Sequence, residues 1–304
     1  MQILKLLINI KATEPVHLPV YKGGAVRSGF GLAFRKVCCP FVNRNCNQCI
    51  LRPNCVWSYV FDTPRPQTAA VLNKAETVPH PFVIEPPDDE TTVLIKGDCL
   101  NFNLILIGRA ADYLPYFIYA FEQMAEQGLG RPRKPFRLIG VYQDKRLIYD
   151  PKQAALIEQA MPMVLNLAPV NETARQIKIK LITPTRIINQ GRLCRRPGFG
   201  NIIRALLRRI WLLSYFHDQV MDIDYQGLIT SAEKVELKEA VFAGANWEHF
   251  SRRQNRVIEY EGITGWAIYT GELGQFLPIL RAGEILHIGK GTTFGMGRYE
   301  MEVQ

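Results

Sequence analysis

The order of helices and strands that the apolar pattern predicts is the same in the two halves of the chain. In the first half, the β-α-β-β-α-β order runs through residues 2–10, 25–37, 91–95, 101–107, 112–127 and 136–142. The second half repeats it through residues 176–182, 199–216, 235–243, 257–270, 274–282 and 299–303. Two such units in succession predict an α+β fold of tandem ferredoxin-like domains. An irregular stretch that ends near residue 169 places the domains at residues 1–168 and 169–304.

Composition places the chain among globular proteins. Apolar residues make up 47% and charged residues 21% of its 304 residues, which is too apolar for an intrinsically disordered chain. Arg109 and Asp112 interrupt the best candidate for a membrane span, residues 104–121, which needs roughly 18 apolar residues. The apolar run at residues 6–10 is too short for a signal peptide. We therefore expect a soluble cytoplasmic protein that does not associate with membranes.

Basic residues are concentrated in one part of the chain. The formal net charge is +9, from 37 Lys and Arg against 28 Asp and Glu. Residues 173–217 contain no Asp or Glu, and their basic residues are Arg175, Lys178, Lys180, Arg186, Arg192, Arg195, Arg196, Arg204, Arg208 and Arg209. Such a stretch favours nucleic-acid binding through counterion release and Arg–phosphate hydrogen bonds; a solvated basic face is the alternative. The candidates for phosphate contacts are Arg192, Arg195, Arg196, Arg204 and Arg208.

Five of the seven cysteines lie close together, at Cys38, Cys39, Cys46, Cys49 and Cys55. Cys46 and Cys49 form a C-x2-C turn, which Cys39 and Cys55 flank at distances that loops could close into a four-thiolate zinc site. Cys38 is the alternative to Cys39 as a ligand. Disulfides would need an oxidising compartment, and five buried free cysteines would be unusually dense. We predict a structural zinc ion in an insert at about residues 38–57 and no catalytic metal, because four thiolates leave no position for water.

A glycine-rich segment at residues 287–299 is the sharpest local motif. Its members that suit phosphate contacts are Gly289, Gly291, Gly295, Gly297, Lys290 and Arg298. The spacing is one residue too long for a P-loop or a dinucleotide fingerprint, and too few residues follow to form the helix that those motifs need. Backbone amides without neighbouring side chains can approach a phosphate closely, so the segment suits phosphate binding. A turn between two strands is the alternative.

The sequence HIGKGTTFGMGRYEM at residues 287–301 resembles the C-terminal signature of the repeat-associated mysterious protein (RAMP) superfamily, specifically of CRISPR precursor-RNA-processing endoribonucleases. Further segments resemble the same family in order: HLPVYKGGAVRSGFGLAF at 17–34, CCPFVNRNCNQCILRPNCVWSYVFDTP at 38–64, ITPTRIINQGRL at 182–193 and NWEHFSRRQNRVIEYEGITGWAIYTG at 246–271. The second of these resembles the cysteine-rich insert of one branch. Ser28 departs from the family, which commonly shows Arg-Gly there.

This resemblance implies metal-independent cleavage of CRISPR repeat RNA. The ribose 2′-hydroxyl would attack the adjacent phosphate and leave a 2′,3′-cyclic end, so that the precursor transcript yields mature guide RNA. Arg252, Arg253, Lys290 and Arg298 would extend the RNA-binding residues. Besides the RNA, other subunits of a CRISPR effector complex are expected partners. The alternative is a non-catalytic RNA-binding scaffold of such a complex, because scaffold members share the fold.

Histidine is the side chain best suited to proton transfer near neutral pH. Members of the family place their acid and base at different positions, so the resemblance does not locate them. We rank His287 first because it begins the glycine-rich segment, close to Lys290, although a histidine there could simply bond to a backbone carbonyl. His17 comes next because it precedes Tyr21 in a loop where catalytic residues of the family often lie. The catalytic candidates are therefore His287, His17, Tyr21 and Lys290.

Overall fold

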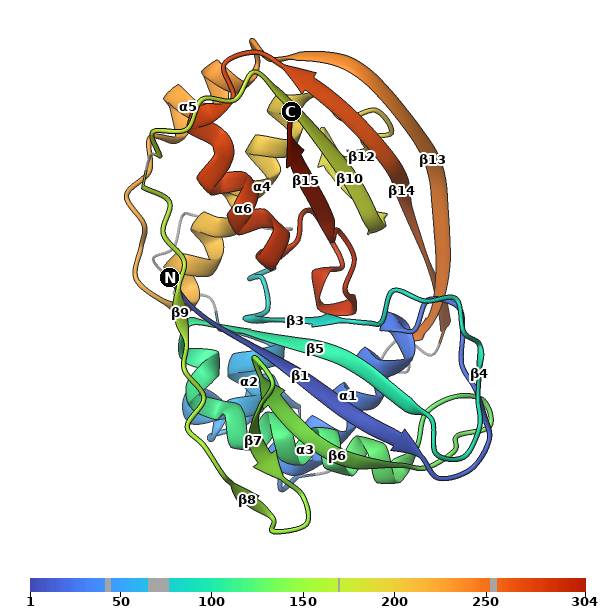
Figure 1. Cartoon of the computed structure of the whole chain (residues 1–304). Coiled ribbons are helices and arrows are strands. Elements are labelled where there is room, and N and C mark those ends of the chain that lie inside the picture. The colour runs from blue at the N-terminus through green and yellow to red at the C-terminus, as the bar shows by residue number, and fades with distance from the viewer. Residues whose placement is uncertain (42–44, 65–76, 169, 252–255) are drawn as a thin grey trace. The chain divides into compact units, whose positions relative to one another are not determined.

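The computed structural model describes residues 1–41, 45–64, 77–168, 170–251 and 256–304, and its residues form two compact units (Figure 1). The N-terminal unit comprises Gln2–Met163 and Phe216–Asp218. The C-terminal unit comprises Met1, Val164–Tyr215 and Gln219–Gln304. Among the described helices, none is long and apolar enough to cross a membrane.

The N-terminal unit is built on an antiparallel sheet. Its strands follow the order β3 (Phe82–Glu85), β5 (Cys99–Ile107), β1 (Gln2–Ala12), β6 (Phe136–Gln143), β7 (Arg146–Asp150) and β8 (Ala155–Leu156). In β1, alternate apolar residues are buried in the core, as expected for a strand that turns one face to the helices: Leu4, Leu6, Ile8 and Ile10. Two short strands, β2 (Val16–His17) and β4 (Val93–Leu94), pair with each other. β9 (Met163–Val164) follows β8.

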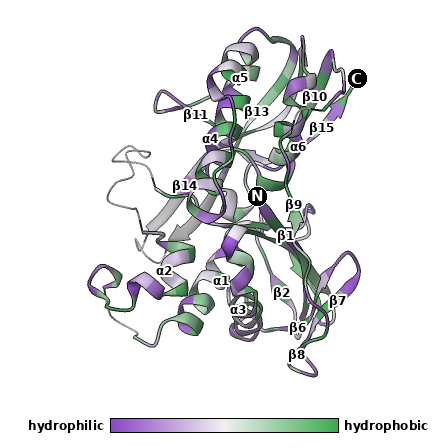
Figure 2. Ribbon diagram, turned by 90° about the vertical axis from the view of Figure 1, so that its left-hand side faces the viewer, coloured by the Kyte–Doolittle hydropathy of each residue, from purple (hydrophilic) through white to green (hydrophobic). Residues whose placement is uncertain are grey.

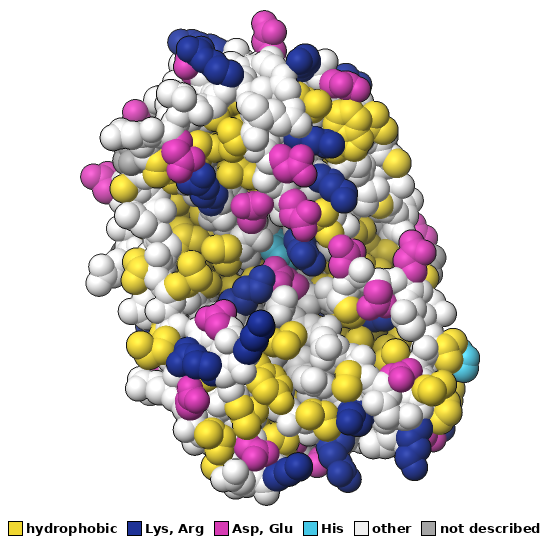
Figure 3. Space-filling model, viewed as in Figure 1, with side chains coloured by type: hydrophobic (Ala, Val, Ile, Leu, Met, Phe, Trp, Pro, Cys, Tyr) yellow, Lys and Arg dark blue, Asp and Glu magenta, His cyan; other side chains and the backbone are white. Residues whose placement is uncertain are grey.

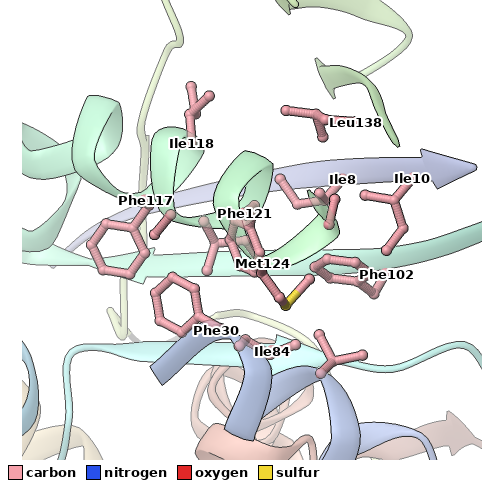
Figure 4. Packing of buried hydrophobic residues seen from close by; sticks show 14 of the residues in the cluster. Ile8, Ile10, Phe30, Ile84, Phe102, Phe117, Ile118, Phe121, Met124 and Leu138 are labelled. Atoms are coloured by element: carbon pink, nitrogen blue, oxygen red, sulfur yellow. The ribbon is translucent and has the colours of Figure 1, made fainter. Parts of the chain in front are cut away.

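Two helices, α1 (Gly23–Cys38) and α3 (Leu114–Gln127), enclose the core of this unit together with the sheet (Figure 4). The ring of Phe30 in α1 stacks on the rings of Phe121 and Phe117 in α3, with centroid distances of 4.6 and 5.4 Å. Burying one such side chain stabilises the fold by about 1.5–3 kcal/mol. The smaller helical elements are α2 (Val56–Phe61), η1 (Cys46–Gln48), η2 (Arg52–Asn54) and η3 (Gly108–Tyr113).

The C-terminal unit is built on a second antiparallel sheet, in the order β13 (Glu236–Ser251), β14 (Arg256–Thr270), β10 (Gln176–Thr185) and β15 (Tyr299–Val303). The helices α4 (Phe199–His217) and α6 (Leu277–Leu286) pack on it. Phe199 lies 5.3 Å from Tyr269 of β14 between ring centroids, and the Tyr299 hydroxyl donates to the Leu280 carbonyl of α6 at 2.6 Å. The remaining elements are β11 (Ile188–Asn189), β12 (Arg192–Leu193), α5 (Tyr225–Ala232), η4 (Gly274–Phe276) and η5 (Thr292–Phe294).

Both units follow the predicted β-α-β-β-α-β order, and the prediction of an α+β fold is confirmed. The corresponding strands also have the same order in the two sheets, β3-β5-β1-β6 and β13-β14-β10-β15. Hydrophobic and hydrophilic residues alternate along the helices of both units (Figure 2), which is the amphipathic pattern on which the prediction depended.

The prediction of one strand was wrong. The sequence predicts the second strand of the first unit at residues 91–95, but the sheet uses β3, residues 82–85. All four residues of β3 are buried, whereas Val93 is 46% exposed and pairs only within the short β2–β4 ladder. Prolines lie on both sides of β3, at 79, 81, 86 and 87, and they weaken the sequence signal of a strand because proline is uncommon within sheets.

Candidate nucleic-acid interface

The glycine-rich segment, residues 287–299, connects α6 to β15. Gly289, Gly291, Gly295 and Gly297 have φ angles of 83°, 78°, 80° and 75°, in the left-handed region that favours glycine. A Cβ on Gly297 would lie 1.9 Å from the Ile288 carbonyl oxygen, so even a methyl group does not fit there. The segment therefore needs glycine both for its backbone angles and for space.

The end of strand β10 holds this segment in place. The Lys290 amide donates to the Arg186 carbonyl at 2.9 Å, and the Gly297 amide donates to the Pro184 carbonyl at 3.0 Å. Across the base of the segment, the Ile288 amide donates to the Gly297 carbonyl at 2.9 Å. These bonds fix the backbone before any ligand binds, which lowers the entropy that binding must overcome.

Prediction from sequence missed Thr183 and Pro184, near the end of β10, as residues that hold the segment. Neither residue is charged, and neither belongs to a motif with the spacing of ligand-binding residues. The one signal that could have found them is the resemblance of ITPTRIINQGRL to the same family as the glycine-rich segment, because segments that recur together often lie together.

Three aromatic rings pack beside the glycine-rich segment. Trp247 stacks on Tyr260 with 4.9 Å between centroids, and Phe294 of the segment lies 5.5 Å from Trp247. The Trp247 indole nitrogen lies 3.3 Å from the Met296 sulfur. Trp247 is only 9% exposed, so it joins the strands to the segment and is not available to stack on a base.

His287 is the residue at the end of α6, and its side chain is completely buried. Its backbone has a φ of 61°, which is unusual for a residue other than glycine. The ring nitrogen Nδ1 lies 3.0 Å from the Met296 carbonyl oxygen. This geometry ties the two ends of the glycine-rich segment together. It supports the structural alternative for His287 and disfavours the proton-transfer role that the sequence ranked first.

The exposed side of the segment carries positive charge. Lys290 is exposed, and Arg298 is partly exposed, with Nη2 lying 3.7 Å from the Glu300 carboxylate. An exposed pair at this distance is weak and can be replaced by a phosphate contact. Both predicted cations are thus placed where an anionic ligand could reach them.

The predicted basic stretch is less uniform in space than in sequence, because acids from other segments pair with it. Arg204 donates to Glu233 at 2.6 Å, and Arg195 lies 3.7 Å from Glu261. Arg175 is paired with Glu272, and Arg208 lies over the Trp211 ring at 5.9 Å. Arg192 and Arg196 are exposed, whereas Arg252 and Arg253 lie outside the described residues. On the face shown in Figure 3, acidic and basic side chains are intermixed.

Arg209 is the one member of the basic stretch that the structure buries among the described residues. Its Nε donates to the carbonyl of Leu286, the last residue of α6, at 2.7 Å. Burial lowers the pKa of Arg209 to about 9, so the guanidinium stays charged at neutral pH. A cation at this end of α6 interacts favourably with the helix dipole and supports the start of the glycine-rich segment.

His17 and Tyr21 belong to the N-terminal unit, where His17 ends β2 and Tyr21 lies in the loop that leads from β2 to α1. His17 is exposed on β2, while Tyr21 is partly buried, and burial raises the pKa of its phenol well above the ordinary value. Tyr21 is therefore protonated at neutral pH and can donate a proton or a hydrogen bond. Next to it, the buried Lys22 donates to the Asp89 carboxylate and to the Asp89 carbonyl, each at 2.9 Å. This pairing anchors the loop.

The cysteines do not form the predicted four-thiolate arrangement. In the part of the chain that the structure describes, no group of three or more His, Cys, Asp or Glu side chains is placed to hold a metal ion. The Cys39 thiol donates to the Phe41 carbonyl at 3.1 Å. Burial, then the neighbouring Cys55 and Cys39, raise the pKa of Cys38 to about 12, which keeps it a thiol. Zinc binding by Cys39, Cys46, Cys49 and Cys55 stays a prediction.

Several known proteins are similar to the chain over nearly its full length. An uncharacterized protein of Archaeoglobus fulgidus is 25% identical over 291 residues, which cover 94% of this chain and 93% of that protein. Among solved structures, a Cas6 product complex has a TM-score of 0.60 and 16% identity, with 99% of each chain covered. Thermus thermophilus Cas6 has a TM-score of 0.56 and 15% identity, covering 99% of this chain and 98% of that one.

A partial Cas6-RT-Cas1–Cas2 complex is also similar, with a TM-score of 0.56 and 14% identity over all of this chain and 46% of that chain. At these identities, the solved structures show a shared fold. The family models go further. Residues 1–161 match the AF_1859_N family, described as an N-terminal domain, and residues 179–299 match the family described as CRISPR-associated endoribonuclease Cas6. The second match contains the whole glycine-rich segment, and this C-terminal part of the chain accordingly belongs to the Cas6 family of CRISPR-associated endoribonucleases.

Proposed function

We propose that this chain binds CRISPR repeat RNA and cleaves the precursor transcript to release guide RNA. The observation that carries the proposal is the preformed glycine-rich segment with Lys290 and Arg298 on its accessible side. It lies in the part of the chain that matches the Cas6 family. The tandem β-α-β-β-α-β units support a ferredoxin-like description of both halves, an architecture that RNA-recognition modules use.

The proposed reaction is an internal transfer at one phosphate. A base takes the proton of the ribose 2′-hydroxyl, and the 2′-oxygen forms a bond to the adjacent phosphorus. The bond from phosphorus to the 5′-oxygen of the next nucleotide breaks, and an acid returns a proton to that oxygen. The products are a 2′,3′-cyclic phosphate and a 5′-hydroxyl. Cations near the phosphate stabilise the charge that develops during the transfer.

We assign these roles to side chains of the protein, with no metal ion in the reaction. His17 is the exposed histidine of the predicted pair, so we assign proton transfer to it. Tyr21 stays protonated at neutral pH and is assigned as a hydrogen-bond donor to the reacting groups. Lys290, Arg298 and the exposed arginines Arg192 and Arg196, all in the C-terminal unit, are assigned to phosphates of the RNA backbone.

We also propose that the protein acts in the cytoplasm of a prokaryotic cell and associates with other CRISPR proteins. The similarity to 46% of a chain in a partial Cas6-RT-Cas1–Cas2 complex supports such an association. The alternative function is that of a scaffold that binds repeat RNA without cutting it, and a cleavage assay distinguishes the two.

The test is a single-turnover assay with labelled CRISPR repeat RNA, compared with an unrelated RNA of the same length and composition. We expect one cut within the repeat and none in the unrelated RNA. Binding of the repeat without a cut would support the scaffold function. Equal, weak binding of both RNAs would contradict the proposed substrate class.

A further inference from the structure

Thr183 contacts the glycine-rich segment at two points through one buried hydroxyl. The side chain is 7% exposed near the end of β10. Its Oγ1 donates to the Gly295 carbonyl at 2.7 Å and accepts a hydrogen bond from the Arg298 amide at 2.9 Å. A hydroxyl can donate one bond and accept others at the same time, and here it does both. The two contacted groups lie on either side of Gly297.

The turn between Gly295 and Arg298 depends on contacts of this kind for its shape. Both Gly295 and Gly297 have positive φ, and glycine loses more conformational freedom on ordering than other residues do. The Arg298 carbonyl also accepts from the Thr183 amide at 3.2 Å, which adds a backbone contact to the two side-chain contacts. These contacts with Thr183 therefore fix the direction in which the backbone leaves the turn at Arg298.

We propose that Thr183 is a positioning residue for RNA binding: its hydroxyl fixes the turn of the glycine-rich segment that presents Arg298 and the neighbouring amides to the RNA phosphate. This inference rests on the proposed function, because it assumes that the segment binds RNA. Thr183 itself touches no substrate in this account. Without its hydroxyl, the Gly295 carbonyl and the Arg298 amide lose this partner, and the turn samples more conformations.

Thr185 offers a matched control in the same strand. Its side chain is fully buried, and its Oγ1 donates to the Thr183 carbonyl at 3.0 Å. Replacing either threonine by valine removes one buried hydroxyl and keeps the branched shape. Only Thr183→Val removes side-chain contacts with the glycine-rich segment, so a general loss of stability and a loss of positioning can be separated.

The experiment compares wild type, Thr183→Val, Thr183→Ser and Thr185→Val. The dissociation constant is measured with repeat RNA that carries a 2′-deoxy nucleotide at the cut site, and amide hydrogen exchange is followed for residues 287–299 without RNA. Thermal unfolding of each variant is recorded in parallel. We expect Thr183→Val to raise the dissociation constant about fivefold or more and to speed exchange in the segment. For Thr183→Ser, we expect the dissociation constant and the exchange rate to stay within about twofold of wild type. Thr185→Val should change neither quantity.

Unchanged affinity and exchange in Thr183→Val, or equal losses in Thr183→Val and Thr185→Val, would overturn the inference. Failure of wild type to bind the RNA would instead refute the proposed function. The hydrogen-exchange comparison still decides in that case whether Thr183 holds the turn, because it needs no RNA.

Discussion

At the scale of single residues, the pairing of Lys22 with Asp89 shows what anchors the loop between His17 and α1. Lys22 is 1% exposed, and its Nζ donates to Asp89 and to the Val20 carbonyl. A lysine buried to this extent needs such acceptors, since a buried and unpaired ammonium is strongly unfavourable. Burial by itself raises the pKa of the Asp89 carboxyl, but hydrogen bonds from Lys22 and Thr91 outweigh it, so the pKa is lowered from its ordinary value of 3.8.

This shift predicts how the stability of the protein depends on pH. Because the folded pKa of Asp89 is below the unfolded value, the unfolded chain binds more protons as the pH falls past about 4. The contribution of Asp89 to stability is therefore complete above that pH and is lost as the pH falls through the folded pKa. Asp89→Asn keeps an acceptor but removes the charge, and should cost about 1 kcal/mol at neutral pH.

Urea unfolding at several pH values checks this. Wild type should lose stability more steeply than Asp89→Asn between about pH 5 and pH 3, so that the two curves converge in acid. Parallel curves over this range would show that the Asp89 charge does not stabilise the loop.

His17 and His287 should behave differently when each is replaced by alanine. His17 is exposed, whereas the His287 ring is buried against the Met296 carbonyl. We expect His17→Ala to slow single-turnover cleavage about 100-fold or more with little change in RNA affinity. His287→Ala should weaken RNA binding and lower the melting temperature, because the segment loses its closing contact. A cleavage defect in His287→Ala with unchanged affinity would restore the catalytic role first considered for it.

At the scale of elements, the glycine-rich segment should tolerate no side chain at Gly297. Gly191, in the turn between β11 and β12, is a matched control: its φ of 79° resembles the 75° of Gly297, but a Cβ there would meet nothing within 4 Å. Both Gly→Ala changes carry the left-handed backbone cost of about 1 kcal/mol, and only Gly297→Ala adds a clash with backbone. We expect Gly297→Ala to abolish RNA binding in a fluorescence-anisotropy titration, with Gly191→Ala close to wild type. Similar affinities for the two variants would refute the requirement for glycine.

The elements also show which parts of the fold can be predicted from a sequence. Alternation along β1 and the periodic apolar face of α4 depend on neighbouring residues, so both were found. β3 is fully buried and lacks alternation, and prolines flank it, so local pattern could not separate it from a loop. The β13–β14 hairpin extends well beyond the predicted residue 243, to Ser251, because its two strands support each other across a long ladder.

The site was predictable only in part, for a similar reason. The glycines and Lys290 could be named from the motif alone. The pairing of Arg204 with Glu233 and of Arg195 with Glu261 joins residues far apart in the sequence, so an acid-free stretch did not imply an acid-free surface. The contact of the His287 ring with the Met296 carbonyl likewise forms only in the folded backbone, so the residue types did not reveal it.

At the scale of the whole molecule, two units of like topology carry different features. The C-terminal unit contains the glycine-rich segment and most of the basic stretch, and the N-terminal unit contains His17, Tyr21 and the cysteines. Duplication of the fold accounts for the length and for the repeated order of elements. It does not account for the function, which depends on side chains that only one unit or the other carries.

The central claim is that the protein itself cleaves repeat RNA by attack of a 2′-hydroxyl. The most direct measurement incubates it briefly, in EDTA, with repeat RNA that is either all ribose or 2′-deoxy at the nucleotide before the cut, and analyses the ends by mass spectrometry. We expect both RNAs to bind equally, and only the all-ribose RNA to be cut, leaving a 2′,3′-cyclic phosphate. Cutting of the deoxy RNA, or binding of both RNAs with cutting of neither, would contradict the claim.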